Sequence, residues 1–136
     1  MTTLAMILDG LEERFRLVPG IHVIIRYEPT SVQDYPLLYS MMENKQSSGG
    51  EEAGLTWHYR ILHRLVFRWQ DNAGAAEELI PFVDAIPAAV DADPQLGGRL
   101  DYGYAQISEV TLNWGKIGGT DCLFLDFISE VATGEG

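Results

Sequence analysis

The chain has 136 residues, 46% of them hydrophobic, and its 20 acidic and 9 basic residues give a net charge of −11 with a pI near 4.5. This size and apolar content predict one folded domain, residues 1–136, and exclude a disordered chain. The charge argues against free nucleic acid as a partner of the whole molecule. One cysteine, Cys122, excludes an internal disulfide framework, and neither a membrane span nor a signal peptide is predicted.

The first predicted element is an amphipathic helix from Thr2 to Arg16. Thr2 or Thr3 can cap its N-terminus, and Pro19-Gly20 stops it. Its apolar residues recur at spacings of three and four and form one stripe, Leu4, Ile7, Leu8, Leu11 and Phe15. The stripe predicts that this helix packs against the core.

Two strands and a long loop are predicted next. The β-branched run Ile21–Tyr27 predicts a strand, Glu28–Tyr35 a connector, and Leu37–Met42 a shorter strand. Asn44–Gly54 has three glycines and no large apolar residue, so it is predicted to be a long hairpin loop. Loops of this length without structure of their own are usually functional or disordered. The loop residues expected to contact a partner are Asn44, Lys45, Gln46, Glu51 and Glu52.

The segment Leu55–Trp69 decides the fold class. Seven of its eight odd-numbered residues are apolar, whereas the even-numbered set is Thr56, His58, Arg60, Leu62, Arg64, Val66 and Arg68. Strand side chains alternate between faces, so this pattern predicts one apolar and one basic face. A helix competes, because several of the apolar residues also have helical spacing, but four aromatic residues favour a strand. The side chains expected to be buried against the helices are Trp57, Ile61, Leu65 and Phe67.

A second helix is predicted over Ala75–Val90, after a turn at Gln70–Gly74. Its apolar seam consists of Leu79, Val83, Ile86 and Val90. Pro81 and Pro87 conflict with a regular helix, because an interior proline costs ~3 kcal/mol. Either this helix is kinked, or its first turn begins near Ile80 with a proline at the first helical position.

Two strands close the chain. Leu100–Trp114 predicts a strand in which the parity of the apolar residues changes, and the change indicates a bulge near Ser108-Glu109. Gly115–Thr120 predicts a hairpin turn, and Asp121–Val131 predicts the last strand, followed by a frayed tail from Thr133 to Gly136. The apolar face of the last strand consists of Leu123, Leu125 and Phe127. This order predicts an α+β fold, a mostly antiparallel sheet with two helices packed on one face.

The sequence gives little support for catalysis or metal binding. His58 and His63 are five residues apart on a predicted strand and so lie on opposite faces, which prevents a joint metal site. Cys122 lies inside a predicted strand, as expected for a small buried hydrophobe. No nucleotide, hydrolase or kinase motif is present. No catalytic, cofactor-binding or metal site is therefore predicted.

The clearest charge feature is the row Arg60, Arg64 and Arg68 on one side of the predicted long strand. Three interpretations stay open. In the first, the arginines pair with carboxylates of neighbouring strands, such as Glu109 or Asp126, on a solvated face. In the second, they form a subunit interface with an acidic surface of another copy. Nucleic-acid binding is a third alternative.

Several local sequences and the order of the elements match one pattern. A short N-terminal helix leads into Ile-His-Val-Ile-Ile-Arg-Tyr, and Tyr35-Pro36 opens the next strand. A long polar loop precedes Trp-His-Tyr-Arg-Ile-Leu-His-Arg-Leu-Val-Phe-Arg, and a helix ends at Asp-Pro-Gln-Leu-Gly-Gly, residues 93–98. This pattern resembles the tail terminator (tail completion) proteins of long-tailed, non-contractile bacteriophages.

The resemblance implies a structural protein of the virion tail, assembled in the host cytoplasm. It implies a homo-oligomer, a hexameric ring that caps the head-proximal end of the tail tube, stops its polymerisation and presents a surface to the head. The partners would be the tail tube protein and the head connector protein, and DNA would pass through the ring without sequence-specific binding. The resemblance also implies no enzyme activity, no cofactor and no membrane.

Other functions stay open at this point. The protein could be a head–tail joining or tail tube protein of the same particle. It could also be a small ligand-binding or regulatory α+β domain, or an enzyme of unrecognised type. The mass in solution separates a hexameric ring from a monomeric or dimeric domain.

Overall fold

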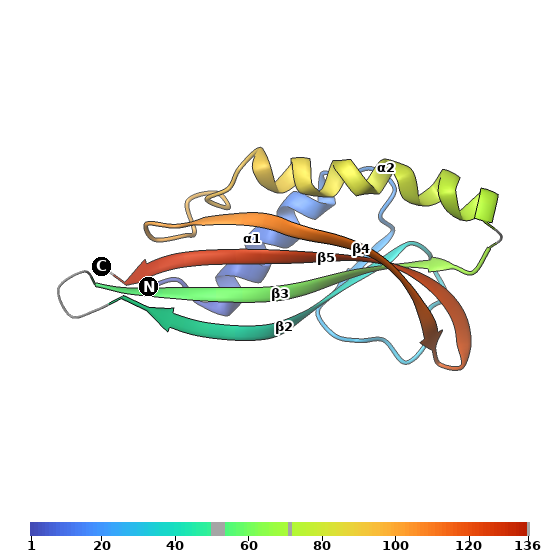
Figure 1. Cartoon of the computed structure of the whole chain (residues 1–136), viewed down its shortest axis with the longest axis horizontal. Coiled ribbons are helices and arrows are strands. Elements are labelled where there is room, and N and C mark those ends of the chain that lie inside the picture. Colours follow the sequence, from blue (N-terminus) through green and yellow to red (C-terminus); the bar gives the residue numbers. More distant parts are fainter. Residues whose placement is uncertain (50–53, 71, 136) are drawn as a thin grey trace.

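The computed structural model describes residues 1–49, 54–70 and 72–135 and confirms the predicted α+β fold. Its elements, in chain order, are α1 (Leu4–Arg16), β1 (Val23–Ile25), β2 (Leu37–Ser48), β3 (Leu55–Arg68), α2 (Asn72–Asp91), β4 (Tyr104–Ile117) and β5 (Thr120–Glu135). The strands form one sheet in the order β1-β2-β3-β5-β4, in which β1 and β2 run parallel and the other pairs are antiparallel (Figure 1).

The main core lies between both helices and one face of the sheet, here called the helix face. The helices contribute Ile7, Leu11 and Phe15 from α1, and Leu79, Phe82, Ile86 and Val90 from α2. The central strand β3 contributes Ile61, Leu65 and Phe67, which are buried as predicted. Trp57 is only partly buried, because it lies near the end of the β2–β3 hairpin, where its pairing partner Ser47 is exposed.

The start of α1 agrees with the sequence, and the start of α2 does not. The Thr3 side chain accepts a hydrogen bond from the backbone nitrogen of Met6 at 3.2 Å and caps α1. α2 begins at Asn72, three residues before the predicted Ala75, so the alternative in which its first turn starts near Ile80 is wrong, and both prolines lie inside the helix. Burial of the apolar side of α2 against the sheet compensates for the backbone hydrogen bonds that prolines cannot make.

The buried side of α2 also differs from the predicted seam at one position. Val83 is exposed, and the neighbouring Phe82 is buried in its place. The Phe82 ring packs against Phe67 with centroids 5.6 Å apart. The Phe82 ring buries more area than the Val83 side chain would. The contact of Phe82 with Phe67 therefore sets the rotation of α2 about its axis.

β1 is shorter and β2 is longer than the sequence predicts. β1 has three residues instead of the seven of Ile21–Tyr27. β2 continues through Asn44–Ser48, which was expected to lie in the hairpin loop, because these residues pair with Thr56–Arg60 of β3. Their side chains are exposed, so backbone hydrogen bonds to an adjacent strand, rather than burial, hold them in the sheet.

The last hairpin confirms the predicted bulge and a turn at Gly118-Gly119. Gly115–Ile117, predicted to belong to the turn, are part of β4, and β4 begins at Tyr104 rather than at Leu100. The β4–β5 register shifts between Ile107 and Glu109, and Gly118 and Gly119 form the turn with φ of 58° and 78°. β5 continues to Glu135, so the prediction of a frayed tail from Thr133 is wrong within the described residues. Strand β3 provides the pairing partners of this C-terminal end.

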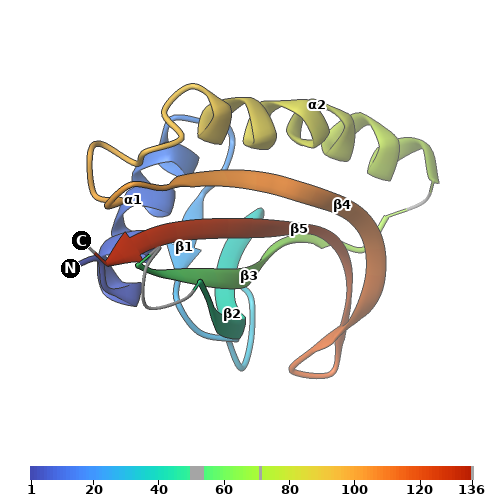
Figure 2. The same ribbon diagram turned by 60° about the vertical axis from the view of Figure 1, so that its left-hand side comes forward.

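The other face of the sheet, here called the open face, has a small core at one end only. Its buried residues are Leu37, Tyr39, Val66, Ile117, Cys122 and Phe124, with Val32 and Tyr35 packed against them. The β4–β5 hairpin curves toward this end (Figure 2), and its Gly118 faces Thr30 of the β1–β2 connection. The opposite end of the open face, near the β2–β3 hairpin, has no covering layer in the described part of the chain (Figures 1 and 2).

A buried histidine joins β2, β3 and β5 inside the main core. His63 bonds through Nδ1 to the Ser40 hydroxyl and through Nε2 to the Ser129 hydroxyl, both at 2.7 Å. Its ring meets the Phe15 ring edge to face, with centroids 4.9 Å apart. Burial lowers the pKa of His63 to about 3, so this side chain is neutral near pH 7.

The free energy of unfolding is therefore expected to fall as the pH drops below ~6.5. The unfolded chain protonates His63 below ~6.5, whereas the folded protein leaves it neutral down to about 3. The loss reaches ~1.4 kcal/mol per pH unit, because one more proton is bound in the unfolded state. Urea unfolding of the parent and of His63→Gln, from neutral to mildly acid pH, measures this slope. A variant with the same slope as the parent would contradict the assignment.

Candidate interaction surface on the open sheet face

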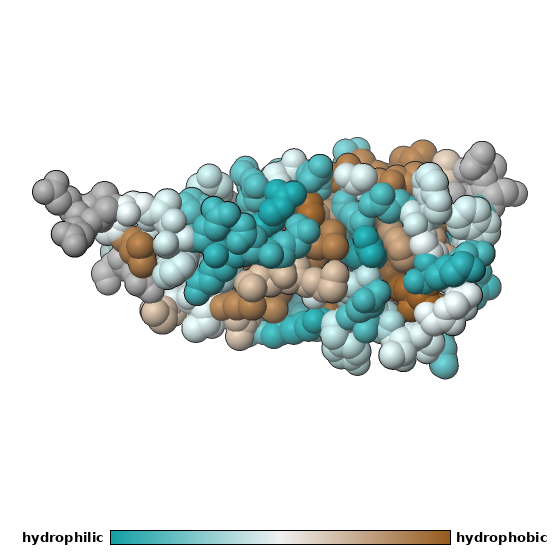
Figure 3. Space-filling view, turned by 60° about the horizontal axis from the view of Figure 1, so that its bottom comes forward, coloured by the Kyte–Doolittle hydropathy of each residue, from teal (hydrophilic) through white to brown (hydrophobic). Residues whose placement is uncertain are grey.

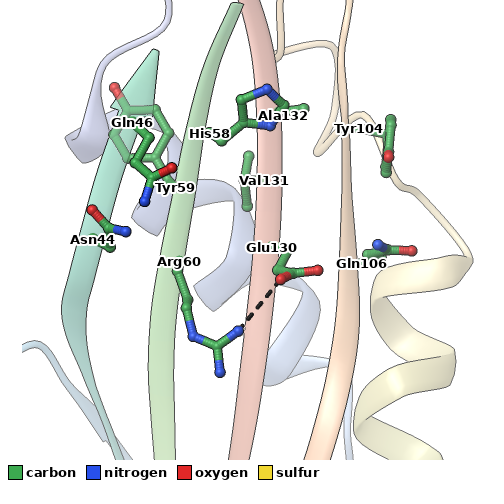
Figure 4. A pocket seen from close by; sticks show the side chains of 10 residues that line it. All are labelled: Asn44, Gln46, His58, Tyr59, Arg60, Tyr104, Gln106, Glu130, Val131 and Ala132. Atoms are coloured by element: carbon green, nitrogen blue, oxygen red, sulfur yellow. Dashed lines mark hydrogen bonds and ion pairs between the residues drawn. The ribbon is translucent and has the colours of Figure 1, made fainter. Parts of the chain in front are cut away.

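The uncovered end of the open face carries a polar hollow of about 290 Å³, here called the Arg60 hollow. Its open-face side chains come from four strands: Asn44 and Gln46 of β2, His58 and Arg60 of β3, Glu130 and Ala132 of β5, and Tyr104 and Gln106 of β4 (Figure 4). On the surface seen in Figure 3, hydrophilic residues cover a broad area, and hydrophobic residues form smaller patches beside it.

The strand register explains why these residues meet. Two rows of pairing partners cross the sheet, Gln46–His58–Ala132–Tyr104 and Asn44–Arg60–Glu130–Gln106. Residues that pair across adjacent strands point to the same face. The small side chain of Ala132 leaves space between His58 and Tyr104, and this space is part of the hollow.

Arg60 is the centre of an ion-pair network at this hollow. Its guanidinium lies 3.3 Å from Glu43, 3.2 Å from Glu109 and 3.3 Å from Glu130. This confirms, for Arg60, the interpretation that the arginine row pairs with carboxylates of neighbouring strands. The four side chains are 42–55% exposed, so each pair contributes under ~1 kcal/mol. Three carboxylates against one guanidinium leave a surplus of two negative charges.

Arg64, the next residue of the row, forms a tighter pair. Its Nε and Nη2 donate to Asp126 Oδ1 and Oδ2 at 2.8 and 2.9 Å, and Asn113 Nδ2 also donates to Oδ2 at 2.7 Å. The side chain of Asp126 is 7% exposed. Hydrogen bonds to Asp126 raise the pKa of Arg64, and burial raises the pKa of the nearby Tyr39. These hydrogen bonds join β3, β5 and β4, so the Arg64–Asp126 pair stabilises the fold.

Arg68, the last residue of the row, has no carboxylate partner among the described residues. Its guanidinium lies 5.5 Å from the centre of the Tyr35 ring, a cation–π distance, and the side chain is exposed. Tyr35 and Arg68 line a groove of about 800 Å³ that also includes Phe67, Phe82 and the hydrogen-bonded pair of His22 and Asp34. The row therefore contains three environments, and its role as a subunit interface stays a prediction.

The predicted partner-contact residues separate in space. Asn44 and Gln46 line the Arg60 hollow, whereas Lys45 points to the helix face, where its Nζ lies 4.4 Å from the Trp57 ring centre. Glu51 and Glu52 lie outside the described residues. Sequence reasoning missed Tyr104, Gln106 and Glu130, because only the long-range register brings β4 and β5 beside Asn44 and Arg60.

Of the side chains that often perform catalysis, His63 and Cys122 are buried. His58 and His63 lie on opposite faces, as predicted: His58 bonds to the Ser48 hydroxyl at 2.7 Å in an exposed position, and His63 is buried. Cys122 is buried in the small core of the open face. Within residues 1–49, 54–70 and 72–135, no group of three His, Cys, Asp or Glu side chains is arranged to hold a metal ion. No helix in these ranges is long and apolar enough to cross a membrane.

The protein has an α+β fold in which helices cover one face of the sheet. The other face carries a polar surface with a network of ion pairs around Arg60. A scan against models of protein families finds no match, and a search of curated proteins finds no similar sequence.

Proposed function

We propose that the protein is a structural virion protein that forms a ring, terminates the tail tube of a long-tailed, non-contractile phage and provides the head-joining surface. The phage tail and the number of six subunits are inferred from the resemblance in sequence pattern. The structural observation that supports a ring is that one sheet has two different open edges on opposite sides. Different edges pair head to tail, and head-to-tail contacts close into rings when the rotation permits.

The first open edge is β4. It has 14 residues, it pairs only with β5 among the described strands, and it contains no proline. Two large apolar side chains on its helix face are exposed, Leu112 by 50% and Trp114 by 70%. Proteins usually protect such long edges with charges, prolines or a short strand. An edge with an exposed tryptophan is typical of an interface.

The second open edge is the part of β2 beyond Tyr39, because β1 pairs with residues 37–39 only. On the helix face beside it lies a groove of about 350 Å³ lined by Met42, Lys45, Trp57, Tyr59 and the first residues of the chain. β4 and β2 run in opposite directions in the sheet, so β4 of one copy can extend the next copy's sheet at β2 as an antiparallel strand. Trp114 would then lie on the same face as this groove.

The proposed ring gives the other expected properties a physical basis. A subunit that contributes an acidic lining repels DNA phosphates, so DNA can slide through without sequence-specific binding. The tail tube protein and the head connector protein would bind the two rims of the ring. In this role the chain needs neither a cofactor nor an enzymatic activity, and it resides in the virion tail.

Sedimentation and negative-stain microscopy of the purified protein test the ring. We expect rings at high protein concentration and expect Trp114→Ala to weaken association by ~2 kcal/mol or more, because buried tryptophans dominate interface energies. Tyr102→Ala is the matched control, since Tyr102 is 90% exposed and lies outside both edge strands. A stable dimer without rings would favour the small ligand-binding domain, and long open tubes would favour a tube subunit.

A further inference from the structure

We propose that the Arg60 hollow binds an extended segment of a partner protein that carries a lysine or arginine side chain. This proposal deepens the proposed function and rests on it for the identity of the partner, which would be the tail tube or head connector protein. Binding itself is a property of one subunit, so it can be measured whether or not a ring forms.

Charge favours a basic occupant. Arg60 and Glu130 line the hollow, and Glu43 and Glu109 bind the same guanidinium from beside it, so the group at the Arg60 side of the hollow keeps a surplus of two negative charges. The chain as a whole carries −11. An incoming cation is attracted both at long range and at the rim, whereas a phosphate or an acidic peptide is repelled.

Within the described part of the chain, three amide side chains at the hollow have free hydrogen-bonding groups. The amide side chains of Asn44, Gln46 and Gln106 line the hollow, and none has a hydrogen-bond partner among the described residues. An amide group presents two N–H donors and one carbonyl acceptor. Three such groups around one hollow match the alternating C=O and N–H groups of an extended peptide better than they match a charged small molecule.

The size and shape of the hollow also fit a peptide segment. The volume of about 290 Å³ lies just below the ~300–1,000 Å³ that is usual for drug-sized ligands. It suits one long side chain with its flanking backbone. Tyr104 forms one wall, is 53% exposed and offers a ring face to a cation.

A second copy of this chain is a weaker candidate for the occupant. Six of its nine basic side chains already bind a carboxylate: Arg16, Arg26, Arg60, Arg64, Arg99 and Lys116. Of the others, Arg14 donates to the Ala89 carbonyl at 2.7 Å, and Lys45 and Arg68 lie over aromatic rings. A partner with its own free lysines or arginines supplies the missing cation without breaking these contacts.

Fluorescence anisotropy with a labelled peptide tests the inference. The probe is a capped peptide in which Lys and Arg alternate with Gly, and its matched control replaces each basic residue by Glu. The key variant is E43Q/E109Q/E130Q, and its control is E77Q/D84N/D91N on the exposed side of α2. Both triple variants remove three negative charges, so they have the same net charge. Circular dichroism and thermal melts check that each variant folds.

We expect the basic peptide to bind the parent and the α2 variant with affinities within about twofold, and the E43Q/E109Q/E130Q variant at least tenfold more weakly, about 1.4 kcal/mol. Gln106→Ala should weaken binding with little change in its salt dependence, because it removes a neutral hydrogen bond. Equal weakening by both triple variants would show that only net charge matters. That result would overturn the proposal. So would equal binding of the acidic peptide, no binding by the parent, or self-association that depends on the three glutamates.

Discussion

Phe67→Ala is expected to lower the free energy of unfolding by ~3–5 kcal/mol. Phe67 lies on the central strand, is 1% exposed and packs against Phe82 of α2 with ring centroids 5.6 Å apart. Truncation removes the transfer free energy of the ring and leaves a cavity at the junction of α2 with the sheet, where neighbouring side chains can relax only partly. Urea unfolding monitored by circular dichroism measures the change.

The matched control for this prediction is Trp69→Ala. Trp69 lies two residues further along the chain, is equally apolar and is 52% exposed. Its truncation is expected to cost clearly less than Phe67→Ala, because about half of its surface stays in water and no enclosed cavity is left. If the two variants lost the same free energy, the assignment of Phe67 to the core contact between β3 and α2 would be wrong.

Asp126→Ala is expected to destabilise the fold by a similar amount, ~3–5 kcal/mol. Asp126 accepts two hydrogen bonds from Arg64 and one from Asn113, and its side chain is 7% exposed. The Arg64 side chain is only 23% exposed in the intact protein. Without the carboxylate, the Tyr39 hydroxyl at 3.3 Å is its one remaining side-chain acceptor among the described residues. An uncompensated charge in such a place costs more than the pair contributes.

Replacing both partners separates the cost of the orphaned charge from the value of the pair. The double variant R64M/D126A removes both charges and is expected to be more stable than Asp126→Ala, because no guanidinium is left without its carboxylate. A double variant as unstable as Asp126→Ala would contradict this explanation. The exposed Arg60 offers a third comparison, since Arg60→Met is expected to cost less than Asp126→Ala, because each of the three exposed pairs that it breaks contributes under ~1 kcal/mol.

This difference within the arginine row changes how an interface role can be tested. Arg64→Glu, the charge reversal at the centre of the row, is the direct test of an interface with an acidic surface. In the structure it would place a carboxylate against Asp126, so loss of assembly would be mixed with loss of stability. Arg68, which is exposed and has no carboxylate partner among the described residues, is the better position for a charge reversal that leaves the fold unchanged.

The sequence by itself determined the elements that depend on local patterns. The alternation in Leu55–Trp69 identified the central strand and its two faces, because strand side chains alternate whatever the neighbours are. The spacing of Leu4 to Phe15 identified α1, and the change of parity near Ser108 identified the bulge. The mostly antiparallel sheet with helices on one face followed from the order of these elements.

Only the tertiary structure decided which side chains meet. Asn44 and Gln46 carry no local signal for a strand, and they belong to β2 because β3 supplies their hydrogen-bonding partners. Glu130 and Gln106 are 70 and 46 residues from Arg60 in the chain, and the register of β3, β5 and β4 alone brings them to the same hollow. Pairing across strands depends on contacts between distant segments, so no periodicity within one segment can encode it.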